Sequence, residues 1–242
     1  LRAAALVYYS LRARLREGNV DRVYVYNGRM AAMRAAFRAC QAEGVECVLH
    51  ERGHSLDTYG LFPNHLPHDI DFRSQCIHEA WEAASDKEEC ARIAAGWYQQ
   101  RVQGVAQNWR SFVDQQCDEL LPDGWDAQKR NIAIFTSSEH EFVAIGDCWK
   151  NDLYDSQIRG VRQITDSLVS HGGDFHVYLR THPNSAGIDN ERTRALAELV
   201  SPVLTVVPAD SKVSTYKLMH EAEKVITFGS TVGIEAAYWG RP

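Results

Sequence analysis

The feature that most constrains the fold of this chain is a regular alternation of β-rich and helical segments between residues 131 and 239. Short runs of β-branched and aromatic residues are typical of strands, and longer amphipathic runs are typical of helices. We expect strands at 131–136, 175–180, 203–207 and 224–228, and helices at 155–171, 191–200, 215–222 and 232–239. Strands and helices that alternate in this way predict an α/β fold with a parallel sheet.

A second α/β unit is expected near the N-terminus. Residues 22–26 and 45–50 predict two strands, and residues 30–43 between them predict a helix, so that the three form a strand–helix–strand unit. Residues 1–16 predict a further amphipathic helix with basic residues on one side. The segment 54–71 contains Gly, Asn, His and Pro residues and predicts a long loop.

The middle of the chain predicts helices and then a domain boundary. Residues 72–121 are expected to form two or three helices, with Trp81, Trp97 and Trp109 as packing anchors. The Leu-Pro-Asp-Gly turn at 121–124 breaks this pattern. We therefore expect two Rossmann-like α/β domains, residues 1–124 with the helical segment inserted and residues 125–242. We also expect the natural protein to extend beyond both ends, because the sequence lacks an initial Met and closes on a turn-like Gly-Arg-Pro.

Charge, hydropathy and cysteine spacing argue against several classes of protein. The formal net charge of -6 is unlike the basic surface of a general nucleic-acid binder. No run approaches the roughly 20 apolar residues that cross a bilayer. The six cysteines lack the spacing of zinc or iron–sulfur ligands, and as free thiols they fit a reducing compartment. We expect a cytoplasmic protein without a metal site.

The turn Gly229-Ser230-Thr231 is the strongest candidate for ligand binding. Ligands of parallel sheets lie beyond the carboxyl ends of the strands, and this turn follows the strand 224–228 and precedes the last helix. Gly229 allows a sharp turn, while the hydroxyl groups and the free main-chain N–H groups predict a phosphate site. The alternative is a Ser or Thr that only caps the helix.

Four further residues join this candidate nucleotide site. Ser137 and Ser138 follow the strand 131–136 in the same way. Gly233 allows a ligand or a neighbouring helix to approach closely. Glu235 lies one turn into the helix, where its carboxylate can accept hydrogen bonds from ribose hydroxyls. A solvated or salt-bridged glutamate is the alternative.

His182 and Pro183 follow the strand 175–180, and Pro183 fixes the backbone of the turn. An imidazole at this position can donate to a phosphate oxygen, and as an imidazolium it offsets the charge of a leaving nucleotide. The alternative is a solvent-exposed turn histidine.

The first half of the chain offers a candidate general base. Glu51 lies between His50 and Arg52 at the end of a strand and can accept the proton of an acceptor hydroxyl. Its rivals in the following loop are Asp57, Asp69 and Asp71. Arg29, Arg52 and Arg101 are candidates for binding an anionic acceptor or the donor phosphates, or for structural ion pairs. Asn27 is a further candidate for binding the acceptor.

Several other catalytic motifs are absent from the sequence. It has no GxGxxG after a strand, no Walker lysine loop, no GxSxG elbow and no HExxH.

These segments resemble those of a known family. Residues 212–242 (KVSTYKLMHEAEKVITFGSTVGIEAAYWGRP), RTHPN at 180–184 and NGR…HERG at 27–53 resemble bacterial capsule and surface-polysaccharide biosynthesis proteins of the GT-B glycosyltransferase type. In capsule sialyl- and Kdo-transferases, a His-Pro motif and a later Ser-Ser/Thr motif hold the CMP-sugar. His182-Pro183 and Ser230-Thr231 match these motifs in order. The acidic-acidic-Gly motif that supplies the base in some sialyltransferases has no clear match.

The resemblance implies metal-independent transfer of a sugar from a CMP- or UDP-linked donor to a growing surface glycan, without a cofactor. It also implies association with the inner membrane surface or with a capsule assembly complex. Three alternatives stay open: an epimerase of nucleotide sugars, a glycerophosphotransferase that uses CDP-glycerol, and a non-catalytic subunit that binds nucleotide or glycan. A shared fold does not by itself decide among them.

Overall fold

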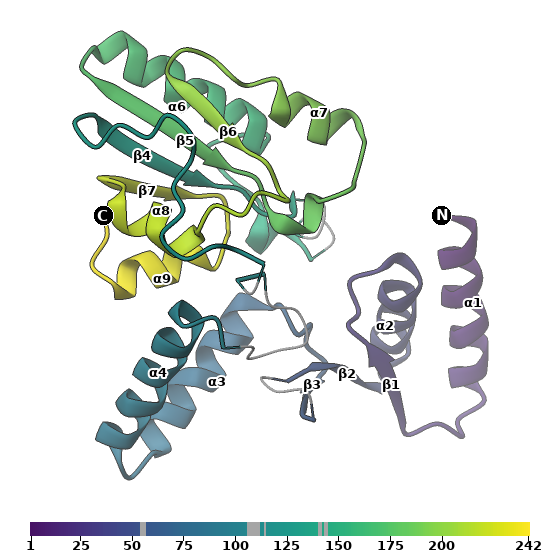
Figure 1. The fold of residues 1–242 in the computed structure, drawn as a ribbon. Coiled ribbons are helices and arrows are strands. Elements are labelled where there is room, and N and C mark those ends of the chain that lie inside the picture. Colours follow the sequence, from purple (N-terminus) through teal and green to yellow (C-terminus); the bar gives the residue numbers. More distant parts are fainter. Residues whose placement is uncertain (54–56, 106–111, 114, 140–141, 143–144) are drawn as a thin grey trace. The chain divides into compact units, whose positions relative to one another are not determined.

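The structure is a computed structural model that describes residues 1–242 except 54–56, 106–111, 114, 140–141 and 143–144 (Figure 1). The chain divides by its internal contacts into two compact units. Unit 1 comprises Leu1–Ala94 and Glu141–Lys150, and unit 2 comprises Ala95–Ala106, Arg110–His140 and Asn151–Pro242.

Unit 1 contains the predicted strand–helix–strand unit. Helix α1 (Arg2–Arg16) precedes strand β1 (Arg22–Tyr26), helix α2 (Ala31–Glu43) and strand β2 (Glu46–Arg52), and β1 pairs in parallel with β2. A short helical turn, η1 (Asp147–Trp149), also belongs to this unit. The helices α1 and α2 pack against each other, and buried side chains such as Phe37, Cys40 and Leu49 fill the space between helix and sheet.

The predicted long loop at 54–71 is partly wrong. Residues Tyr59–Pro63 form a strand, β3, which pairs antiparallel with β2 and completes a sheet of order β1-β2-β3. The strand forms because Phe62 packs into the unit 1 core and the side chain of Asn64 accepts a hydrogen bond from the main chain of Cys47 at 2.9 Å. Pro63 is tolerated at the end of this edge strand. Residues 54–56 of the loop lie outside the described residues.

The helical prediction for residues 72–121 holds only in its first part. Helices α3 (Ile70–Ala83) and α4 (Lys87–Val102) are present, whereas residues 112, 113 and 115–121 form turns or irregular structure. Trp81 is not a packing anchor, because its side chain is 43% exposed and lies under Lys87. Trp109 lies outside the described residues.

Unit 2 has the predicted alternation of strands and helices. Its four strands are all parallel and lie in the order β6-β5-β4-β7. In chain order the elements are β4 (Arg130–Phe135), α6 (Gln157–His171), β5 (Phe175–Arg180), η2 (Pro183–Ser185), α7 (Glu191–Ala197), β6 (Leu204–Val207), α8 (Thr215–Glu221), β7 (Lys224–Thr227) and α9 (Val232–Tyr238). A Rossmann-like parallel sheet is therefore confirmed for this unit.

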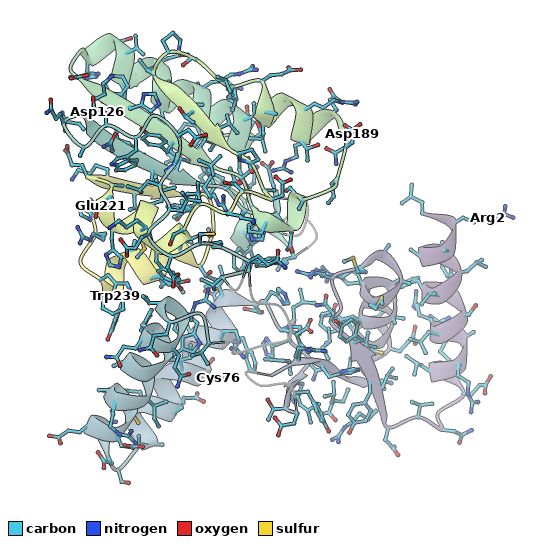
Figure 2. The ribbon with its side chains drawn as sticks, in the orientation of Figure 1. Arg2, Cys76, Asp126, Asp189, Glu221 and Trp239 are labelled. Atoms are coloured by element: carbon cyan, nitrogen blue, oxygen red, sulfur yellow. The ribbon has the colours of Figure 1, made fainter. Side chains whose placement is uncertain are left out.

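Helices cover both faces of the unit 2 sheet (Figure 1). On one face, α6 and α7 pack through residues such as Val161 and Leu196. On the other face, α8 and α9 pack through Leu218 and Ala236. Trp239, labelled in Figure 2, follows α9 and packs against this second core, with its ring edge-on to His220. The strands are consequently buried on both sides, as their near-continuous apolar sequences predict.

Candidate functional site

A cavity of about 110 Å³ lies at the carboxyl ends of the unit 2 strands. Strand β4 pairs with β5 on one side and with β7 on the other, so the strand order reverses at β4. In open α/β sheets, ligands bind at this switch point. The cavity lies there because its wall is built from strand ends: Phe135 ends β4 and Thr136 follows it, Arg180 ends β5 and His182 follows it, and Ser230 comes after β7. We call it the switch-point cavity.

The structure brings five of the predicted nucleotide-site residues to this cavity. They are His182, Pro183, Ser230, Thr231 and Glu235. The two motifs that the sequence places far apart, His-Pro and Ser-Thr, therefore line one space. Arg101 and Gln116, which precede residue 124, also contribute to the wall.

Gly229 and Gly233 allow the turn and the close packing of the backbone beside the cavity. Gly229 has φ +74°, a left-handed conformation that favours glycine and lets the chain turn after β7. A Cβ atom at Gly233 would lie 2.7 Å from the hydroxyl oxygen of Thr227. Gly233 therefore permits close packing of α9 against strand β7, which favours a packing role over the predicted approach of a ligand.

Ser137 and Ser138 are buried but are not part of the cavity wall. The main-chain N–H of Ser137 donates to the side chain of Gln157 at 3.0 Å, and the Ser137 hydroxyl accepts from Gln157 at 2.7 Å. Ser137 thus ties the end of β4 to the start of α6. A nucleotide contact of either serine stays a prediction.

The orientation of the His182 ring is set by its own turn. Its Nδ1 atom accepts a hydrogen bond from the main-chain N–H of Asn184 at 3.1 Å, and its main-chain N–H donates to Thr136 at 2.9 Å. Because Nδ1 is an acceptor, the neutral ring carries its proton on Nε2. The ring of Phe112 lies edge-on at 5.9 Å between centroids. A neutral His182 can therefore act as a hydrogen-bond donor through Nε2.

Helix α9 contributes less than the sequence suggested. It spans seven residues, and Thr231 at its N-cap makes no side-chain capping bond. The Ser230 hydroxyl accepts from the main-chain N–H of Val232 at 3.3 Å, so the capping role is filled by Ser230. A dipole from so short a helix is small. Any anion in the cavity depends mainly on side chains.

Glu235 is part of a buried ion pair. Its side chain is 2% exposed, lies 3.0 Å from the Arg101 guanidinium and accepts a hydrogen bond from the Tyr216 hydroxyl. Burial and the bond to Glu235 raise the pKa of the Tyr216 hydroxyl. Burial lowers the pKa of Arg101, but the hydrogen bond and the charge of Glu235, together with Tyr216, outweigh burial and leave the pKa above its ordinary value. The salt-bridged alternative for Glu235 is thus observed, and a ribose contact stays a prediction.

Arg180 is a charged residue of the cavity wall to which the sequence analysis assigned no role, although it begins the RTHPN segment. It is 3% exposed and ends the buried strand β5. Its guanidinium donates to the main-chain carbonyl oxygens of Pro208 at 3.2 Å and Ser211 at 3.0 Å. Burial lowers the pKa of Arg180 to about 10, against the opposing attraction of Asp210. The signal was available: Arg180 follows Tyr178 at the two-residue spacing of one buried strand face.

The first-half candidates lie in unit 1. Asn27 is buried, has φ +58° and donates a hydrogen bond to the carboxylate of Glu51. Asn27 and Glu51 meet because β1 and β2 are parallel and end side by side. Glu51 and Arg52 line a cavity of about 540 Å³ together with His68, Arg73 and Trp149. Arg29 lies beside this group, with its guanidinium 3.3 Å from the His68 ring.

Among the rival bases, Asp69 has a structural role. It caps α3 by accepting from the main-chain N–H of Phe72 at 3.0 Å, and this bond holds the pKa of Asp69 below its ordinary value. Within the described residues, no group of three or more His, Cys, Asp or Glu side chains could hold a metal ion. In the same part of the chain, none of the helices has the length and apolar character to cross a membrane.

Comparison with known proteins gives a match at the level of the fold. No protein-family model and no curated protein sequence matches the chain. Among solved structures, KpsC of Thermosulfurimonas dismutans, a beta Kdo 2,4 transferase, matches with a TM-score of 0.56 and 12% identity. The match covers 90% of this chain and 66% of that chain. The chain shares its fold with a Kdo transferase.

Two further solved structures match more weakly. One is a Listeria monocytogenes protein provisionally named UDP-N-acetylglucosamine 2-epimerase, with a TM-score of 0.36 and 14% identity. The other is S. aureus MnaA in a co-structure with UDP, with a TM-score of 0.35 and 13% identity. Each match covers 99% of this chain and 60% of the other chain. The chain thus spans less than two thirds of the length of KpsC and of these two proteins.

Proposed function

We propose that this chain is part of a GT-B type glycosyltransferase that moves a sugar from a nucleotide-sugar donor to a growing capsular or surface polysaccharide. The observation that carries the proposal is the meeting of His182 with Ser230 and Thr231 in the switch-point cavity. A parallel sheet binds nucleotides at this place. The fold shared with KpsC supports a transferase of this type.

In the proposed reaction, the switch-point cavity holds the nucleotide phosphate. An acceptor hydroxyl oxygen attacks the anomeric carbon of the sugar, and the bond from that carbon to the phosphate oxygen breaks. His182 donates from Nε2 to a phosphate oxygen, and the hydroxyls of Ser230 and Thr231 donate to others. These donors stabilise the negative charge that builds on the leaving nucleotide.

Unit 1 supplies the acceptor side in this proposal. Glu51 takes the proton of the acceptor hydroxyl, and the hydrogen bond from Asn27 fixes its carboxylate. Asn27, Arg29 and Arg52 bind the acceptor. The assignment of residues 1–124 to the acceptor and residues 125–242 to the donor, and a reaction without metal or cofactor, belong to the same proposal. So does a cytoplasmic location at the inner membrane surface.

A thermal-shift screen of the full chain with CMP, UDP, CDP and GDP tests the donor site. A ligand that binds only the folded protein raises its melting temperature, so we expect a pyrimidine nucleotide to stabilise it. His182→Ala and Ser230→Ala should each abolish this shift, while Ser170→Ala, at an exposed helix position, should preserve it. Equal and negligible shifts with all four nucleotides would overturn the proposal.

Transfer activity tests the enzyme assignment. With the nucleotide sugar whose nucleotide gives the shift and a surface-glycan acceptor, Glu51→Gln should lower the transfer rate by about 100-fold or more, because a general base contributes about that factor. EDTA should leave the rate unchanged. Conversion of the nucleotide sugar without any acceptor would instead identify an epimerase. Unchanged biological activity in Glu51→Gln would favour a binding subunit.

A further inference from the structure

The switch-point cavity contains two arginines with different surroundings. Arg101 forms an ion pair with the buried carboxylate of Glu235 at 3.0 Å. Arg180 forms no such ion pair with any carboxylate of the described residues, and its guanidinium donates to two main-chain carbonyl oxygens. The exposed Asp210 attracts Arg180 only from beyond ion-pair distance. The three charged groups Arg101, Arg180 and Glu235 therefore leave one positive charge on the cavity wall.

The environment of Arg180 is unfavourable for a charge without a partner. Arg180 is only 3% exposed, and its Nε–H has no hydrogen-bond partner among the described groups. A buried charge without a counter-charge is strongly unfavourable. With its pKa lowered only to about 10, Arg180 still carries its charge at neutral pH. A cavity that keeps such a charge is suited to an anionic ligand.

The neighbours of Arg180 fix its position relative to the rest of the site. Pro208 and Ser211 hold the two ends of the guanidinium. The main-chain carbonyl of Arg180 accepts from the Thr136 hydroxyl at 3.3 Å, and the same hydroxyl accepts from the main-chain N–H of His182 at 2.9 Å. A preorganised charge of this kind interacts with an anion without the cost of ordering a flexible side chain.

We propose that Arg180 is the fixed counter-charge for the phosphate of the bound nucleotide. This inference rests on the proposed function, in which the switch-point cavity holds the donor nucleotide. Arg180 acts on the phosphate and not on the base or ribose. A nucleotide and its nucleoside have the same base and sugar and differ only in the phosphate. The contribution of Arg180 is therefore the difference between the affinities of the two.

Isothermal titration of the full chain with cytidine, CMP, uridine, UMP and UDP tests this role. In the wild type, a nucleotide should bind at least tenfold more tightly than its nucleoside. Arg180→Met should lower nucleotide affinity at least tenfold, to near the level of the nucleoside, and should leave nucleoside affinity unchanged. Arg162→Met, an exposed arginine on α6, is the matched control and should change neither.

A second variant separates charge from folding. Arg180→Lys keeps the positive charge and should retain at least a third of the wild-type nucleotide affinity. Without ligand, Arg180→Met should melt at or above the wild-type temperature, because it removes a buried charge that has no counter-charge.

The outcomes distinguish this inference from the proposed function. Nucleotide binding in the wild type with equal nucleotide affinity in Arg180→Met would overturn the role of Arg180 and leave the donor site intact. The role of Arg180 would also be overturned if a folded Arg180→Lys variant bound nucleotide no more tightly than nucleoside. This second result tests the proposal if the Arg180→Met variant does not fold. Absence of binding by every nucleotide in the wild type would overturn the donor site and this inference together.

Discussion

Arg101, Tyr216 and Glu235 form a polar cluster at the switch-point cavity, with Tyr216 and Glu235 buried. Glu235 is 2% exposed and has a cation on one carboxylate oxygen and a phenol on the other. The cluster joins the end of α4 to α8 and α9 within unit 2. A buried ion pair adds little over an apolar pair of the same shape, but removal of one partner leaves an uncompensated charge. The cluster should therefore be sensitive to single substitutions.

Glu235→Gln should destabilise the protein by about 2–3 kcal/mol, because it leaves the partly buried Arg101 without a counter-charge. The matched control is Glu221→Gln, which removes a surface ion pair with Lys217. Glu221 is the last residue of α8 and is labelled in Figure 2. That change should stay within about 0.5 kcal/mol. Urea unfolding of both variants measures the difference. Equal stabilities would show that the buried pair contributes nothing specific.

The sequence predicted which residues lie at strand ends better than it predicted which side chains contact one another. His182 and Ser230 could be found because strand ends are visible in the sequence and parallel strands bring their ends together. The partner of Glu235 could not, because Arg101 lies on a distant helix and no local pattern joins the two. Arg180 was missed for a related reason: its position marks a buried strand face, but its lack of a carboxylate partner is visible only in three dimensions.

Close packing of helices on the unit 2 sheet depends on small residues at a few contact points. A Cβ atom at Gly160, in the first turn of α6, would lie 2.7 Å from two ring carbons of Phe228. Phe228 is buried in the core beneath α6 and has little room to move. By contrast, a Cβ atom at Gly96 of α4 would have no neighbour within 4 Å. A larger residue would therefore clash with the core at Gly160 but would fit without a clash at Gly96.

Gly160→Ala should destabilise the protein by about 1–2 kcal/mol, because overpacking of the core exceeds the gain in helix propensity. Gly96→Ala should stabilise it by about 0.5–1 kcal/mol, because alanine restricts the unfolded chain and nothing opposes its methyl group. Calorimetric melting of the two variants checks both signs. A stabilising effect of alanine at both positions would contradict the packing of α6 on Phe228.

The elements of unit 2 were predicted within a few residues because buried parallel strands are continuous apolar runs and their helices are amphipathic. Strand β3 was missed because Gly60 and Pro63 are loop-like in the sequence, while its stability comes from pairing with β2 and from burial of Phe62. Tertiary contacts overrode local propensity there. The same limit explains the turns found where helices were expected between residues 112 and 121.

The described residues of the chain form two sheets of different character. The sheet of unit 1 is mixed, and that of unit 2 is parallel with its strand order reversing at β4. The match to KpsC covers 90% of the chain, so the likeness of fold extends over both units. The chemistry of the reaction is a separate question, because one fold supports many functions. It depends on what the switch-point cavity binds.

A crystal structure of the full chain with the nucleotide that binds most tightly tests this account most directly. We expect the nucleotide phosphate in the switch-point cavity, within hydrogen-bonding distance of Nε2 of His182 and of the hydroxyl of Ser230 or Thr231. A phosphate bound instead beside Arg52 and Arg73 in the unit 1 cavity, with the switch-point cavity empty of nucleotide, would contradict it.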